Sequence, residues 1–245
     1  MSRPAESASL AGRCILITGA GGGLGGVAAR ACAERGAQLV LLDRVVSKLE
    51  TLSDELVSHG HRQPALYPLD LAKAGDADHA ELADILLGQF GGLHGILHCA
   101  AAPGNLGPLA DLTQAGLEHL LRVNLSAAHG LTRALLPLLR QTGDAAVVFT
   151  SDASARRGQA YWGGYGLAKI ALEALARMLA QELEGEGRVR AHLLIPGAID
   201  SPIRRHTHPG EHPEQRRRPD DLAETLASLL GSATTAPKEW LIDRS

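Results

Sequence analysis

The sequence predicts an α/β fold, a doubly wound parallel sheet with helices on both faces. From Cys14 onward, short apolar runs alternate with longer segments of helical character. The runs are apolar throughout, which is typical of strands that are covered on both faces. Strands that are separated by helices also favour parallel pairing, because each crossover helix carries the chain back to the end of the sheet at which the previous strand began.

Six strands are expected before residue 200. The strand segments are CILIT (from Cys14), AQLVLLD, PALYPLD, GILHCA, AAVVFTS and VRAHLLIPG. The helices between them are expected up to Arg35 and near residues 45–59, 75–90, 113–140 and 160–184. Residues 200–219 are irregular and are interpreted as a substrate lid or loop. A last helix is expected to begin at Pro219, Asp220 and Asp221.

The length and composition of the chain predict one domain. The 245 residues match one large α/β domain, assigned to residues 10–245, after a flexible tail at residues 1–9. A formal net charge of -3 provides no broad attraction for nucleic acid or anionic lipid. There is no apolar run of membrane-spanning length and no apolar core of a signal peptide near the start. We therefore expect a cytoplasmic protein with neither a nucleic-acid nor a membrane partner.

Neither a disulfide framework nor a metal site is expected. Cys14, Cys32 and Cys99 form no C-x-x-C pair and leave an odd residue over. Cys14 and Cys32 are interpreted as buried small apolar residues. His206, His208 and His212 lie close together in the sequence, but proline and glycine interrupt them, so a solvated lid is favoured over a zinc site.

A glycine-rich loop follows the first expected strand and opens the first expected helix. This position is the one that a dinucleotide-binding loop of a Rossmann-type fold requires. Glycine permits positive φ and lets backbone N–H groups approach a pyrophosphate at the positive end of a helix. The loop residues expected at the cofactor are Gly19, Gly21, Gly22, Gly23 and Gly25.

Asp43 ends the second expected strand, where an acidic side chain can accept hydrogen bonds from the adenosine ribose and repel a 2′-phosphate. This favours NAD as the cofactor. Arg44 follows at once and could pair with a phosphate, so NADP is not excluded.

Tyr165 and Lys169 are spaced four residues apart on an expected helix and therefore project from one face of it. An ammonium beside a phenol stabilises the phenolate and lowers its pKa toward working pH. The pair is therefore a candidate acid and base.

Together these motifs resemble those of the short-chain dehydrogenase/reductase family over about residues 11–230, and are closest to a poorly characterised bacterial subgroup. The shared motifs are T-G-x-x-x-G-x-G from Thr18 to Gly25, Asp43, LDL at 69–71, VNLSA with Asn124, Y-x-x-x-K at 165–169 and Pro196-Gly197. The resemblance implies an NAD(P)-dependent oxidoreductase and leaves the substrate open.

The resemblance also implies roles for particular residues. Tyr165 would donate or accept the substrate proton, Lys169 would hold the nicotinamide ribose and assist the tyrosine, and Asn124 would support a water relay. Asp70 and Leu71 would flank the adenine. The other residues expected at the cofactor are Leu24, Cys99, Ala100, Ala101, Pro196, Gly197, Ile199 and Ser201. Helices 113–140 and 160–184 would form a homodimer or homotetramer.

One position departs from the pattern of the family. The family places a serine thirteen residues before its tyrosine, and Asp152 occupies that position here. A carboxylate about 4 Å from the phenol would cost the phenolate roughly 4 kcal/mol at an effective dielectric near 20. Three hypotheses follow. Asp152 donates as a neutral acid, or Ser151 or Ser154 supplies the hydroxyl, or catalysis is weak or lost.

A second departure lies after the fourth strand, where the family has N-N-A-G and this chain has HCAA at 98–101. An alanine in place of the glycine narrows the space beside the cofactor. His98 is interpreted as a packing residue at the end of the strand, because the tyrosine already supplies proton transfer.

The predicted function is an oxidoreductase that transfers a hydride between NAD(P) and an alcohol or carbonyl group of a small molecule. The alternative is a catalytically weak or silent NAD-binding sensor or scaffold, in which Asp152 has removed turnover.

Overall fold

The computed structural model describes residues 9–234, 236 and 239–245. Most of the flexible tail predicted at residues 1–9 lies outside the described residues. The strands are β1 (Cys14–Thr18), β2 (Gln38–Asp43), β3 (Ala65–Pro68), β4 (Gly95–His98), β5 (Ala145–Thr150), β6 (Val189–Ile195) and β7 (Leu241–Asp243).

All neighbouring strands pair in parallel in the order β3-β2-β1-β4-β5-β6-β7. The order reverses between β1 and β4, and ligands of such sheets bind in the crevice outside the carboxyl ends of the strands at this point. The predicted doubly wound parallel sheet is therefore confirmed.

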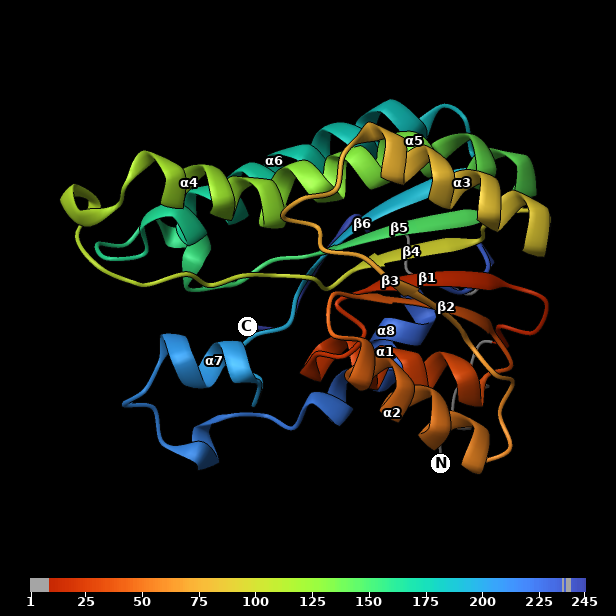
Figure 1. Cartoon of the computed structure of the whole chain (residues 1–245), viewed down its shortest axis with the longest axis horizontal. Helices are drawn as coiled ribbons and strands as arrows, with labels where there is room; N and C mark the ends of the chain where they lie inside the picture. The colour runs from red at the N-terminus through yellow and green to blue at the C-terminus, as the bar shows by residue number, and fades with distance from the viewer. Residues whose placement is uncertain (1–8, 235, 237–238) are drawn as a thin grey trace.

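Helices cover both faces of the sheet (Figure 1). One layer contains α1 (Gly23–Glu34), α2 (Val46–Ser58) and α8 (Ala223–Leu229). The other contains α3 (Asp76–Phe90), α4 (Gln114–Leu121), α5 (Ala127–Thr142) and α6 (Gly163–Glu184). A further short helix, α7 (Pro202–Thr207), belongs to neither layer. It lies beyond the end of the sheet, at the left of Figure 1 and below α4.

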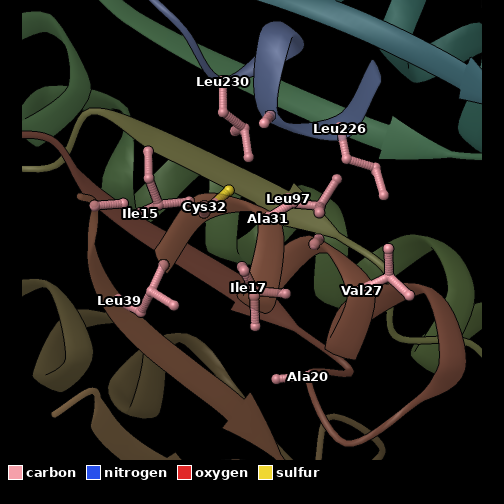
Figure 2. Packing of buried hydrophobic residues seen from close by; sticks show 14 of the residues in the cluster. Ile15, Ile17, Ala20, Val27, Ala31, Cys32, Leu39, Leu97, Leu226 and Leu230 are labelled. Atoms are coloured by element: carbon pink, nitrogen blue, oxygen red, sulfur yellow. The ribbon is translucent and has the colours of Figure 1, made fainter. Parts of the chain in front are cut away.

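The alternating side chains of the strands separate the core into two layers. Ile15 and Ile17 pack on the α1 side of the sheet, and Leu16 packs on the opposite side. Figure 2 shows Ile15 and Ile17 together with Val27 and Cys32 of α1. Burial of each large aliphatic side chain stabilises the fold by about 1.5–3 kcal/mol, so the two layers hold the carboxyl ends of the strands in place.

Three elements differ from those predicted. β7 was not predicted, because its three residues pair only with β6, a contact distant in the sequence. The helix predicted at 113–140 is interrupted by a π-helical turn at Arg122–Ser126, so α4 and α5 flank it. The irregular stretch at 200–219 contains α7, and a 3-10 turn at Pro219–Leu222 precedes α8.

No helix among the described residues has both the length and the apolar character needed to cross a membrane.

Candidate active site

Two adjoining cavities open at the carboxyl ends of the strands. One, of about 200 Å³, lies beside β2 and β3; the other, of about 240 Å³, extends toward α6 and α7. Both are lined by Gly19, Asp43, Ala100 and Ala101, so they form one groove across the switch between β1 and β4. We call them the adenine-side cavity and the tyrosine-side cavity.

The glycine loop is tight enough to exclude side chains at two positions. Gly19 has a φ of +65°, and a Cβ there would lie 2.7 Å from the backbone of Ala100. A Cβ on Gly25 would lie 2.3 Å from the carbonyl oxygen of Gly19. Gly22, Gly23 and Leu24 also line the tyrosine-side cavity. The backbone at the start of α1 is therefore open to a ligand in the groove.

Asp43 lies at the end of β2 and is held by two backbone groups. Its Oδ2 accepts a hydrogen bond from the N–H of Gly21 at 3.1 Å, and its Oδ1 accepts one from the N–H of Val45 at 3.1 Å. Arg44 lines the adenine-side cavity. Lys48, which the sequence analysis missed, lines the tyrosine-side cavity one helical turn farther along the chain. Two cations therefore flank the carboxylate.

The wall of the adenine-side cavity comes from the segment after β3. Asp70 and Leu71 line it, as expected, together with Leu42 and Ala72. The N–H of Ala72 donates to Oδ1 of Asp70 at 3.1 Å, which fixes this turn.

Asn124 supports the opposite wall without lining either cavity. Its Oδ1 accepts from the N–H of Ala102 at 3.0 Å. Its Nδ2 donates to the carbonyl oxygens of Ala102 and Leu120, each at 2.9 Å. Asn124 lies in the π-helical turn, a feature frequent at functional sites. The amide therefore ties this turn to the segment after β4.

The end of β4 provides packing residues rather than reactive ones. His98 stacks on Phe149 with ring centroids 5.0 Å apart, and its Nε2 lies 2.9 Å from the Thr132 hydroxyl. Burial lowers the pKa of His98 to about 3. Burial raises the pKa of the Cys99 thiol to about 12, so the thiol is unreactive although it lines the tyrosine-side cavity.

Tyr165 and Lys169 are both buried in the wall of the tyrosine-side cavity, with exposed fractions of 3% and 2%. The ammonium of Lys169 lies 5.7 Å from the centroid of the tyrosine ring and donates to the carbonyl oxygen of Thr150 at 2.9 Å. Burial lowers the pKa of Lys169 to about 8, although Asp152, Cys99 and Glu173 oppose the shift.

The pKa of Tyr165 is shifted in the direction opposite to the one expected. Burial raises it well above its usual value, and the charge and hydrogen bond of Asp152 raise it further. The phenol is therefore protonated at neutral pH, as a proton donor requires.

Asp152 occupies the position that the sequence analysis assigned to it. Its Oδ2 accepts from the Tyr165 hydroxyl at 3.4 Å, and its Oδ1 accepts from the N–H groups of Ser154 and Ala155. The Ser151 hydroxyl instead donates to Glu173 at 2.6 Å. The Ser154 hydroxyl lies 3.1 Å from Nε2 of His208. Both candidate serine hydroxyls are thus engaged away from the phenol.

The segment after β6 covers the tyrosine-side cavity. Pro196, Gly197, Ile199 and Ser201 line it, as expected. Ser201 also caps α7, because its hydroxyl accepts from the N–H of Arg204 at 3.1 Å.

Arg204 is not among the site residues that the sequence predicts, but it lines this cavity and pairs with Glu211. Glu211 also pairs with Arg216, at 3.1 Å. The three lid histidines have separate neighbours: His206 contacts the carbonyl oxygen of Gly104, His208 contacts Ser154, and His212 lies near Glu214.

Comparisons with known proteins agree with this arrangement. Residues 13–212 match the family described as short chain dehydrogenase. The chain is 33% identical to the uncharacterized oxidoreductase YciK of Escherichia coli, over 89% of this chain and 86% of that protein. It is 30% identical to the rhamnolipids biosynthesis 3-oxoacyl-[acyl-carrier-protein] reductase of Pseudomonas aeruginosa, over 92% of this chain and 91% of that protein.

Solved structures are similar over nearly the whole chain. A short chain dehydrogenase from Pseudomonas syringae superimposes with a TM-score of 0.93 at 39% identity, covering 100% of this chain and 99% of that one. One from Shigella flexneri, complexed with NADP, has a TM-score of 0.91 at 31% identity, with coverages of 97% and 99%. One from Escherichia coli, complexed with NADPH, has a TM-score of 0.91 at 32% identity, with coverages of 97% and 98%.

Proposed function

Because the chain belongs to the short-chain dehydrogenase family, we propose that it transfers a hydride between NAD(P) and an alcohol or carbonyl carbon of a small molecule. The observation that carries the proposal is the burial of Tyr165 and Lys169 in the same groove that the glycine loop opens. A proton donor and a dinucleotide-binding loop in one groove supply the two parts of carbonyl reduction, the proton and the hydride.

The residues of the groove are suited to the dinucleotide. A Cβ at Gly19 or Gly25 would meet protein backbone, so only glycine keeps this loop tight against β4 and the start of α1. The pyrophosphate would lie at the N-terminus of α1, the adenine beside Asp70 and Leu71, and the nicotinamide beside Ile199 and Ser201. When bound, the nicotinamide supplies or accepts the hydride.

We propose that the chain accepts NADP(H) as well as NAD(H). Arg44 and Lys48 flank Asp43, and neither has an ion-pair partner among the described residues. Both could pair with a 2′-phosphate, which Asp43 alone would repel. The relatives from Shigella flexneri and Escherichia coli that are complexed with NADP and NADPH support this proposal.

In the proposed mechanism Tyr165 donates its proton to the carbonyl oxygen during reduction, and accepts it during oxidation. The Lys169 ammonium stabilises the phenolate that remains after donation. Asn124 is a positioning residue, since its amide hydrogen-bonds the backbone of Ala102 in the wall of the groove but does not itself line the groove. Trp162 and Ile203 pack near Tyr165 and would cover an apolar part of the substrate.

We further propose that Asp152 restrains the reaction at neutral pH. A carboxylate at this position opposes the negative charge that develops on the substrate oxygen. Of the three hypotheses for this position, donation by Ser151 or Ser154 has the least support, because their hydroxyls contact Glu173 and His208. The silent sensor is less favoured than the enzyme, because the relatives are described as oxidoreductases.

The test is Tyr165→Phe, assayed with a panel of aldehydes, ketones and alcohols by NADPH and NADH absorbance. We expect turnover to fall by at least about a hundredfold, the contribution of a general acid, while dinucleotide affinity stays unchanged. The matched control is Tyr161→Phe, which alters a tyrosine that is 63% exposed. Retained turnover in Tyr165→Phe would exclude the mechanism. Binding of NADH alone would exclude the proposed role of Arg44 and Lys48.

A further inference from the structure

The segment that follows β5 carries Asp152 and is fixed by its own backbone. The carbonyl oxygen of Asp152 accepts from the N–H of Arg156 at 3.1 Å, and its Oδ1 accepts from two further N–H groups of the same segment. The segment ends in a 3-10 turn at Ala155–Arg157. We call residues 151–157 the β5 turn. Its position decides where the Asp152 carboxylate lies relative to the phenol in the groove.

Arg156 ties the β5 turn to two other elements. It does not line the groove. Its Nε lies 3.1 Å from Oε2 of Glu173 on α6, and its Nη1 lies 3.1 Å from Oδ2 of Asp243 on β7. The side chain of Glu173 is 15% exposed, and that of Arg156 is 32% exposed. Charges that are joined in a partly buried network hold a geometry better than an isolated surface pair does.

Glu173 connects this network to the candidate active site. It follows Lys169 by four residues on α6, so the two side chains lie on one face of the helix. Its Oε1 accepts from the hydroxyl of Ser151 at 2.6 Å. The residue before Ser151 is Thr150, whose carbonyl oxygen accepts from the Lys169 ammonium. Glu173 therefore acts on the lysine through its charge and on the start of the β5 turn through a hydrogen bond.

Several other groups also face the Lys169 ammonium. Burial lowers the pKa of Lys169 to about 8, whereas Asp152, Cys99 and Glu173 act to raise it. The ring of Tyr165 lies 5.7 Å away, and the charge of Lys169 adds to the burial that lowers the pKa of His98. Among the described residues, Glu173 is the one member of this set with an ion-pair partner, Arg156. Its effect on the lysine can therefore be changed from outside the groove.

The end of β7 also supports the groove directly. The N–H of Arg244 donates to the carbonyl oxygen of Ile195 at 2.8 Å. Gly197 lines the tyrosine-side cavity with a φ of +75°, and a Cβ there would lie 2.5 Å from the carbonyl oxygen of Arg244. Asp243 precedes this contact and holds Arg156. The end of β7 therefore supports two sides of the groove, the segment after β6 and the β5 turn.

We propose that Arg156 is a positioning residue for the reaction, which holds Glu173 beside Lys169 and ties the β5 turn, and with it Asp152, to the end of β7. Its consequence for catalysis rests on the proposed function, whereas its effect on the lysine does not. Without the guanidinium, the charge of Glu173 acts on Lys169 unopposed and favours the charged ammonium. Without the carboxylate, the unpaired guanidinium acts in the opposite direction.

The test is a pH titration of Lys169 in the full chain, followed by NMR of protein that contains isotope-labelled lysine. The resonance is assigned by its absence in Lys169→Arg. We expect the titration midpoint to rise by about half a pH unit or more in Arg156→Gln, and to fall by a similar amount in Glu173→Gln. A general loss of packing would shift both variants in the same direction, so opposite shifts identify the effect of the ion pair.

The matched control is Arg157→Gln, which removes the next arginine along the chain, an exposed one. It should leave the midpoint unchanged. Arg156→Lys keeps the positive charge and should retain the wild-type midpoint. Asp243→Asn should accelerate hydrogen exchange at residues 153–157 by about tenfold, because it frees the β5 turn from β7. An unchanged midpoint in Arg156→Gln, or the same shift in Arg156→Gln and Arg157→Gln, would overturn the proposal.

The titration separates this proposal from the proposed function, because it requires no substrate. A wild type that turns over no substrate, but whose Lys169 midpoint shifts as expected in the variants, would contradict the proposed function alone. Where turnover is measured, the alkaline limb of kcat/KM for reduction should move to higher pH in Arg156→Gln, together with the midpoint. A limb that stays in place while the midpoint moves would overturn the assignment of Arg156 to the reaction.

Discussion

At the scale of single residues, burial and a neighbouring carboxylate together raise the pKa of the candidate acid, Tyr165. Asp152 contacts the Tyr165 hydroxyl at 3.4 Å, and the Lys169 ammonium lies 5.7 Å from the centroid of the tyrosine ring. A carboxylate near the phenol disfavours the phenolate, whereas an ammonium near it favours the phenolate. In this chain burial raises the pKa of Tyr165, and the charge and hydrogen bond of Asp152 raise it further.

Replacement of Asp152 tests its proposed restraint on the reaction. We expect Asp152→Ser to raise kcat/KM for carbonyl reduction at pH 7 by about tenfold or more, because it removes a negative charge near the developing alkoxide. The measurement is steady-state kinetics with NADPH. Lower activity in Asp152→Ser would instead assign the carboxylate a positive role.

The lowered pKa of Lys169 predicts a loss of activity in mild alkali. A lysine with a pKa of about 8 is charged below that pH and neutral above it. The phenol, whose pKa is raised well above its usual value, remains protonated over the same range. We therefore expect kcat/KM for reduction to fall as the pH rises through about 8, measured as a pH profile.

Lys169→Arg is the control for this assignment, because a guanidinium stays charged throughout this range. Whatever activity this variant retains should show no decline near pH 8. A wild-type profile that is flat to pH 10 would contradict the role of the ammonium.

At the scale of elements, the segment after β6 is an organised cover rather than a loose loop. Ser201 caps α7, and Glu211 pairs with both Arg204 and Arg216, whose side chains are 13% and 7% exposed. The arginines lower the pKa of Glu211 to about 2. Since a lowered carboxyl pKa stabilises the fold while the group is ionised, this contribution is fully present above about pH 4.5 and is lost progressively as the pH falls toward about 2.

The variant Glu211→Gln should loosen this cover. It leaves two poorly exposed guanidinium groups without their shared carboxylate, so hydrogen exchange at residues 202–208 should accelerate by about tenfold. Exchange mass spectrometry measures this change. The control is Asp220→Asn, which removes a pair whose side chains are 81% and 59% exposed and should have no effect. Equal exchange in Glu211→Gln and the wild type would show that the ion pairs do not hold α7.

At the scale of the whole molecule, the outer face of α6 exposes several apolar side chains. Leu167, Ile170 and Met178 are 49%, 40% and 56% exposed there. Exposed apolar side chains that gather on one helix are typical of an interface. We propose that this face forms a homodimer or homotetramer.

Light scattering tests this proposal. The wild type should have the mass of two or four chains, and Ile170→Glu combined with Met178→Glu should shift it toward a monomer, because association would bury both charges unpaired. Leu109→Glu is the control, since this exposed leucine lies outside α6. A monomeric wild type would contradict the proposal.

Local pattern was enough to predict the sheet, most of its helices and the cofactor groove. The apolar runs ending at Thr18 and Asp43 and the glycines after β1 belong to contiguous segments, whose conformations follow from nearby residues. The strand order of such a sheet then brings their ends together. For that reason Gly19, Asp43, Ala100 and Tyr165 all line one groove, as the sequence analysis expected.

The sequence by itself therefore determined the fold class, the groove at the carboxyl ends of the strands and most of the side chains that line it. Only the tertiary structure decided the pairing of β7, the contact of Ser151 with Glu173, the entry of Lys48 and Arg204 into the groove and the ion pairs of Arg156. It also decided the upward shift of the Tyr165 pKa. These features depend on burial and on contacts between segments that are distant in the chain. The local spacing of residues in the sequence reveals neither of them.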